Sequence, residues 1–192
     1  MGITPGMFAA EISGHLFSPA GAFDALSFIT LSGTPTTAIS FTSIPQTYTH
    51  LQIRAYGRVL EATNSSNILF TFNSDSGSNY SYEYLYNSSN TTVGGGATNP
   101  NAGYGLGFRF PGTSNTASHM GHGYMNIPDY SSTTKNKSLS GFTGHDGNSG
   151  FPNGQTFYWA SDWTGTAAIS TITLSNTTGF ASGSVFTLYG IR

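Results

Sequence analysis

Apolar and polar residues alternate along short stretches of this chain, and clusters of glycine, asparagine, serine and proline separate the stretches. Successive side chains of a β-strand point to opposite faces, so this two-residue period is typical of strands that bury one face. In "THLQIRAYGR", for example, the apolar Leu51, Ile53 and Ala55 alternate with polar residues. About ten or eleven such stretches, with no helical periodicity, predict an all-β fold: an antiparallel β-sandwich of jelly-roll type, with a closed barrel as the alternative.

The first 24 residues differ from the rest of the chain, because prolines and glycines interrupt every local pattern. We predict an irregular N-terminal arm at residues 1–24, used in assembly or anchoring, and a sandwich domain at 25–192. The arm is apolar and needs a surface to cover it; its anchoring candidates are Met7, Phe8, Ile12, Leu16 and Phe17. Within the domain, "LSFITL" and "TAISFT" predict a hairpin around "SGTPT", and residues 87–103 predict a long flexible loop.

Charge is scarce: charged residues make up 7% of the chain, against roughly 25% in an ordinary soluble protein. A surface of hydroxyls and amides with a net charge of −2 is poorly protected against association, which predicts a protein that works in an assembly. Six basic residues supply no basic stripe, so we expect no nucleic-acid partner. No apolar stretch of about 20 residues and no signal peptide are present, so we expect no membrane partner and synthesis in a cytoplasm.

Side chains that could perform chemistry do not form a recognisable motif. His119 and His122 have an odd spacing, which sends them to opposite faces of a strand. The acidic residues are far apart in sequence, although two of them could still meet in space as a glycosidase requires. The stretch "NSDSGSN" lacks the glutamate that closes a calcium loop and fits a β-turn at Asp75 and Gly77. We therefore expect no metal, no cofactor and no enzymatic activity.

Alternating aromatic residues offer a candidate contact surface. Tyr80, Tyr82, Tyr84 and Tyr86 fall on one face of a strand, where they form either a platform for a sugar or a partner, or part of the core with hydroxyls at its rim. Trp163 follows the same alternation in "FYWASDW", and we expect it to be partly exposed at the end of a strand.

Two of the six basic residues stand in one strand. Arg54, Tyr56 and Arg58 are predicted to share the face opposite Leu51 and Ile53. They are either a solvated outer face, paired across strands with Glu61 or Glu83, or a contact between subunits. The sequence leaves both interpretations open.

The chain resembles a family of structural proteins from tailed-bacteriophage virions. The residues that carry the resemblance are "FTSIPQTYTHLQIR", "LFTFNSDSGSNYSYEYLY", "NIPDYSSTTKNKSLSGF" and "AAISTITLSNTTGFASGSVFTLYGI", and the similarity spans Leu26 to Ile191. These motifs are structural and bring no catalytic residue with them. The resemblance implies a jelly-roll or β-sandwich domain on the surface of the head or tail, after assembly in the host cytoplasm.

Two roles follow from this resemblance. The first is a head decoration or cement protein that binds the major capsid protein or other virion proteins as a homo-oligomer, a trimer. The second is a tail or tail-fibre component whose loops and aromatic strands bind a glycan of the host surface. A lectin-like carbohydrate-binding module is a third interpretation.

Overall fold

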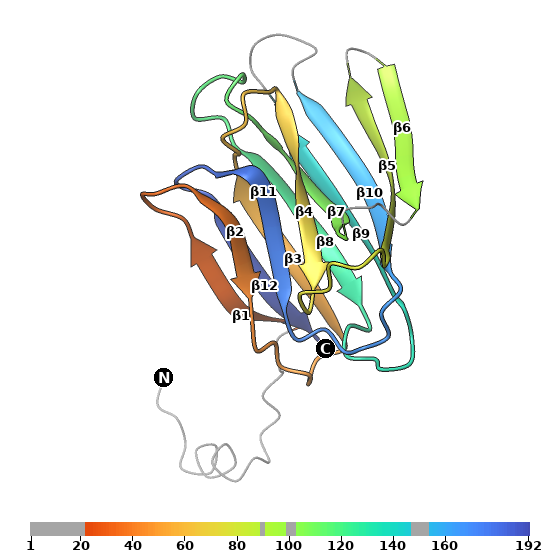
Figure 1. Cartoon of the computed structure of the whole chain (residues 1–192). Coiled ribbons are helices and arrows are strands. Elements are labelled where there is room, and N and C mark those ends of the chain that lie inside the picture. The colour runs from red at the N-terminus through yellow and green to blue at the C-terminus, as the bar shows by residue number, and fades with distance from the viewer. Residues whose placement is uncertain (1–21, 89–90, 99–102, 147–153) are drawn as a thin grey trace, which may run out of the picture.

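The computed structural model describes residues 22–88, 91–98, 103–146 and 154–192, and the regular structure in these ranges is all β-strand. Twelve strands form two antiparallel sheets that face each other (Figure 1). The predicted all-β sandwich is therefore confirmed. In this part of the chain, no helix has the length and apolar character needed to cross a membrane.

The larger sheet has eight strands. In spatial order they are β1 (Phe23–Thr30), β12 (Val185–Ile191), β3 (His50–Gly57), β8 (Gly121–Pro128), β9 (Lys137–His145), β10 (Gln155–Trp163), β5 (Tyr80–Ser88) and β6 (Thr91–Thr98). The smaller sheet has four strands, in the order β2 (Thr36–Phe41), β11 (Ile172–Phe180), β4 (Ser65–Phe72) and β7 (Gly105–Pro111). The larger sheet therefore has an inner face toward the smaller sheet and an outer face toward solvent (Figure 1).

The core lies between the sheets and is rich in phenylalanine. From the smaller sheet, Phe70 and Phe72 of β4 and Phe108 of β7 are completely buried. From the larger sheet, Leu51 and Ile53 of β3 are also completely buried, as the alternation in this strand predicts. The polar partners of these residues on β3 point outward, so the two-residue period defines the inner and outer faces.

The predicted hairpin at residues 26–42 is wrong. β1 lies at the edge of the larger sheet and β2 at the edge of the smaller one, so the chain crosses the sandwich between them. The backbone of Leu31 exchanges hydrogen bonds with the turn before β12, where it donates to the Ser184 carbonyl and accepts from the Gly183 amide. Two stretches of similar pattern can join different sheets, and the period alone does not distinguish the two cases.

The predicted long loop at 87–103 is also wrong, because residues 91–98 form β6 and pair with β5. A strand with three consecutive glycines is unusual, since glycine loses much conformational freedom when it is ordered. Gly95 lies directly opposite Tyr84, and a Cβ there would lie 2.6 Å from the Tyr84 hydroxyl. The absent side chain makes room for the ring.

The N-terminal arm is mostly outside the described residues, including Met7, Phe8, Ile12, Leu16 and Phe17. The first strand begins at Phe23, two residues before the expected domain boundary at residue 25. Any arm therefore enters the domain through β1, at the edge of the larger sheet.

Candidate functional site

The tyrosines of β5 point to the inner face and do not form an exposed platform. Tyr80 is completely buried, and Tyr82, Tyr84 and Tyr86 are half-buried against the core. The Tyr80 hydroxyl accepts a hydrogen bond from the Phe72 amide at 3.0 Å and donates one to the Asp75 carbonyl at 3.1 Å. These contacts fit the second of the two interpretations, in which the tyrosines belong to the core and its rim.

Trp163 is not an exposed contact residue, so that prediction is wrong. Its side chain is 3% exposed, and its indole N–H donates to Asp75 Oδ2 at 2.7 Å. The same carboxylate accepts from the Gly77 amide at 2.9 Å and from Asn79 at 2.8 Å. Burial raises the pKa of Asp75, but these three hydrogen bonds outweigh it and leave the pKa below its usual value. The "NSDSGSN" stretch is therefore a turn whose carboxylate has protein donors.

Arg58 does not share the outer face with Arg54 and Tyr56. β3 ends at Gly57, and the Arg58 side chain turns inward, where the residue is 8% exposed. Its guanidinium donates to three backbone carbonyls of the loop before β8, those of Asn115 at 2.8 Å, Thr116 at 2.7 Å and His119 at 3.0 Å. The predicted interface role of Arg58 is therefore replaced by a structural one: it holds this loop to the sheet.

Arg54 and Tyr56 do lie on the outer face, as predicted. Arg54 pairs with neither Glu61 nor Glu83. Its guanidinium lies over the rings of Phe23 and Tyr189, 5.3 and 5.1 Å from their centroids. We call Phe23, Phe28, Arg54 and Tyr189 the β1 patch. Phe28 is 67% exposed and Phe23 is 44% exposed, so the patch is an exposed apolar surface at the edge of the larger sheet, where the described part of the chain begins.

The outer face carries a line of large side chains that runs across seven of the eight strands. The strand registers place one residue from each strand directly opposite the next. In order from β1 to β5, this aromatic row consists of Phe28, Thr187, Arg54, Tyr124, Phe142, Tyr158 and Leu85. Tyr124 and Tyr158 are 42% and 55% exposed, and none of these residues except Arg54 was a predicted site residue. The alternation in the sequence could have revealed these residues, because the even-numbered residues of β8, β9 and β10 point outward.

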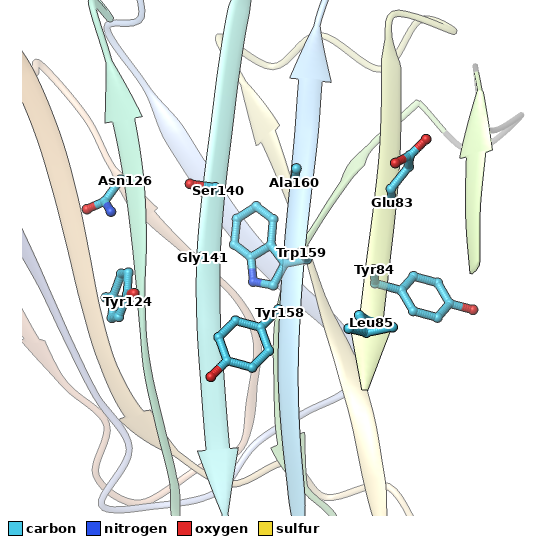
Figure 2. A pocket seen from close by; sticks show the side chains of 10 residues that line it. All are labelled: Glu83, Tyr84, Leu85, Tyr124, Asn126, Ser140, Gly141, Tyr158, Trp159 and Ala160. Carbon is cyan, nitrogen blue, oxygen red and sulfur yellow. The ribbon is translucent and has the colours of Figure 1, made fainter. Parts of the chain in front are cut away.

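A second line of residues, the polar row, lies beside the aromatic row at a distance of about 7 Å along each strand. Its members from β3 to β5 are Gln52, Asn126, Ser140, Ala160 and Glu83. Figure 2 shows the polar row across β8, β9, β10 and β5, with the small Ser140 and Ala160 between Asn126 and Glu83, and Tyr124, Tyr158 and Leu85 of the aromatic row beside it. The small side chains leave a hollow of about 430 Å³ beside the rings of Tyr124 and Tyr158.

This hollow continues into two neighbouring ones. Ala160 lines all three, the second extends past Ser138 to His50, and the third extends past Ser138 to Asp162. We call the three together the outer groove. It is open and shallow. Its main part lies on β8, β9, β10 and β5 (Figure 2), and the second hollow extends to His50 of β3 and Ile191 of β12.

Hydrogen bonds fix the orientation of one polar group at the groove. Arg54 Nε donates to Gln52 Oε1 at 2.8 Å, and Gln52 Nε2 donates to Asn126 Oδ1 at 2.8 Å. The amide oxygen of Asn126 therefore faces Gln52, and its NH₂ group is left to face the groove. Sequence reasoning could not find this relay, because it depends on the register of β3 with β8.

Two carboxylates line the same part of the groove. Glu83 lies opposite Ala160, and Asp162 lies opposite Ser81, so the two are diagonal neighbours on the outer face. Both are exposed, and neither has a hydrogen-bond or ion-pair partner among the residues that the structure describes. Within the same ranges, no three histidines or acidic residues come together as a metal site.

On the other side of the larger sheet, a small set of half-buried polar groups and one buried histidine lie between the sheets. Arg109 of β7 donates to Ser65 Oγ at 2.9 Å and to Gln155 Oε1 at 3.0 Å, and its guanidinium lies 4.8 Å from the centre of the Tyr86 ring. Nearby, His145 is 9% exposed, and its Nε2 has no partner in the described part of the chain. Burial and the positive charge of Arg109 lower the pKa of His145 to about 4, so this imidazole is neutral at pH 7.

Comparison with known proteins adds no relative: the chain matches no protein family, no curated protein and no solved structure.

Proposed function

We propose that this chain is a non-enzymatic structural subunit of a tailed-bacteriophage virion, and that it decorates the outside of the head as a homo-oligomer, a trimer. The observation that carries the proposal is the β1 patch. Phe28 at the open edge of an eight-stranded sheet is 67% exposed, and Phe23 at the start of the same strand is 44% exposed. Large exposed apolar side chains gathered at one edge of a sheet mark sites of protein association. The sequence resemblance to virion proteins supplies the class of partner.

The topology supports a jelly-roll interpretation of the sandwich. If the β8–β9–β10 meander is taken as one unit, the strands from β2 to β11 make eight successive units. The smaller sheet then has the order β2, β11, β4 and β7, which are units 1, 8, 3 and 6. The larger sheet contains β3, the meander, β5 and β6, which are units 2, 7, 4 and 5, and β12 and β1 are added at its edge. This order supports the proposal of a jelly roll, an architecture found in viral capsid proteins and lectins.

The arm and the β1 patch together make the anchoring surface in this proposal. Phe23 begins β1 and belongs to the patch, so the arm is joined to the domain at one of the exposed rings. The apolar residues of the arm insert into a groove of the capsid or of a sister subunit, and the patch packs against the same neighbour. Addition of a strand to the free edge of β1 is one way to form this contact.

Copy number per particle tests the proposal. Quantitative mass spectrometry of purified virions should find hundreds of copies for a head decoration protein. A handful or a few tens of copies would instead assign the chain to the tail, and its absence from virions would refute a structural role.

A pair of variants tests the anchoring surface. Phe28→Ser removes the most exposed ring of the patch and should lower the occupancy of the protein on particles. Leu85→Ser is the matched control, because Leu85 is 49% exposed on the same sheet face but lies at its other end. Equal occupancy for Phe28→Ser and the wild-type protein would show that the β1 patch is not the anchor.

A further inference from the structure

We infer that the outer groove is a binding site for uncharged carbohydrate. This goes beyond an anchoring role, because the rings and polar groups that carry the inference lie on β8, β9, β10 and β5, whereas the rings of the β1 patch lie on β1 and β12. Carbohydrates have apolar C–H faces and a rim of hydroxyl groups. A site for them needs flat apolar rings and, close beside the rings, polar groups that both donate and accept hydrogen bonds.

The flat rings are present as a continuous surface. On three adjacent strands, the rings of Tyr124, Phe142 and Tyr158 follow one another with centroids 6.2 and 5.1 Å apart. The two tyrosines are exposed by about half, and the phenylalanine between them is half-buried. Each of the two tyrosine rings combines an apolar body with a polar hydroxyl tip, so it can contact the C–H face of a sugar and its hydroxyls together.

The polar groups stand along one side of these rings. Asn126, Ser140 and Glu83 lie in the polar row, about 7 Å from the aromatic row along each strand. The Asn126 amide is held by the Gln52 relay with its NH₂ group available as a donor, whereas the Glu83 carboxylate is an acceptor. A preset orientation lowers the ordering cost of binding, which favours affinity in a shallow site.

The charge of the groove restricts the ligand class. None of the described residues around the three hollows is a lysine or an arginine, and two of them, Glu83 and Asp162, are acidic. Phosphates and acidic sugars would be repelled by these carboxylates. An apolar peptide segment would cover Asn126, Ser140 and Glu83 without pairing them, and unpaired polar groups are costly to bury. An uncharged sugar has hydroxyls that can pair with each of these groups.

The twist of the sheet allows the groove and the β1 patch to serve different partners. Adjacent strands rotate by about 20–25° relative to each other, and three to four strand steps separate β12 from β9 and β10. The outward direction at Phe142 and Tyr158 therefore differs by about 60–100° from that at Tyr189. A subunit anchored through β1 can leave the groove open to solvent.

Saturation-transfer NMR on the full chain tests the inference. The probes are the methyl glycosides of glucose, galactose, mannose and N-acetylglucosamine, with the methyl glycoside of N-acetylneuraminic acid as the acidic comparison. We expect transfer to at least one uncharged glycoside, with millimolar affinity, and none to the acidic one. Tyr158→Ala should weaken binding about three- to tenfold through the lost ring contact. Tyr158→Phe keeps the ring and should retain binding.

The chain contains a matched control for this experiment. Tyr56 has nearly the same exposure as Tyr158, 50% against 55%, and lies on the same sheet face outside the groove. Tyr56→Ala should therefore leave glycoside binding unchanged, and Asn126→Ala should weaken it. The inference is overturned if all four uncharged glycosides fail to bind, if only the acidic one binds, or if Tyr56→Ala weakens binding as much as Tyr158→Ala. It is also overturned if Tyr158→Ala dissociates an oligomer, since the groove would then be a contact between copies.

Discussion

Lowering the pH from 7 should destabilise the fold through a single histidine, His145. Burial and the charge of Arg109 lower its folded pKa to about 4, whereas the unfolded value is about 6.5. The unfolded chain therefore binds a proton that the folded protein does not bind. Stability from this residue is complete above pH 6.5 and is lost as the pH falls from 6.5 to about 4.

The size of the effect follows from the difference between the two pKa values. One pKa unit corresponds to 1.36 kcal/mol, so a difference of about 2.5 units gives about 3 kcal/mol over the whole window. That is a large part of the 5–15 kcal/mol by which folded proteins are usually stable. The Nε2 atom of His145 has no partner among the described residues, so protonation would also leave a buried N–H unpaired.

Urea unfolding at a series of pH values between 7.5 and 4.5 measures this effect. The wild-type free energy of unfolding should fall steadily below pH 6.5. His145→Gln removes the titrating group and keeps a polar side chain, so its curve should be nearly flat over the same window. Parallel curves for the two proteins, or a wild-type protein that becomes more stable on acidification, would contradict the reasoning. The lower limit of the series avoids the range in which Asp75 is protonated.

Three further substitutions test the structural roles by urea unfolding at pH 7. Lys137→Met should lower the free energy of unfolding by about 2 kcal/mol, because the ammonium group of this 1%-exposed residue donates to three backbone carbonyls. An unchanged free energy of unfolding would argue against this role. Trp163→Phe should cost a similar amount and raise the pKa of Asp75 through the lost indole hydrogen bond, and a carboxyl titration by NMR that shows no rise would contradict this. Gly105→Ala should cost about 1–3 kcal/mol, since a Cβ there would lie 2.1 Å from the Phe70 ring, and a neutral result would mean that the ring can move aside.

The period of the sequence predicted the strands and their faces, but it could not predict which strands pair. The alternation in β3 placed Leu51 and Ile53 on the buried face correctly, whereas for Tyr80 of β5 it left a core position and an exposed platform both open. The stretch of β1 and that of β2 looked like two arms of a hairpin, yet they lie in different sheets. β6 was missed because consecutive glycines do not predict a strand. Gly95 leaves room for the Tyr84 ring, and this fit exists only after β6 pairs with β5.

The candidate site was harder to predict for the same reason. Arg58 was placed on the outer face by continuing the alternation one step past Gly57, where the strand ends. Trp163 was placed near the surface because it ends a strand, but its indole N–H reaches Asp75 in a turn far away in sequence. The aromatic row is assembled from seven strands, so no local pattern reveals it, although each of its members obeys the alternation.

The placement of the cations has a consequence for how quickly this protein meets its partners. Three of the six are partly or fully withdrawn from the surface: Arg58 and Lys137 are buried, and Arg109 is half-buried. Two others form ion pairs on the exterior, Lys135 with Asp129 at 2.6 Å and Arg192 with Asp24 at 3.0 Å. The field around the molecule is therefore weak, and diffusional encounter is not steered over long distances. Its association rates should lie near the unsteered range of about 10⁵–10⁶ M⁻¹s⁻¹ and change little with ionic strength, so that shape at close range decides which collisions succeed.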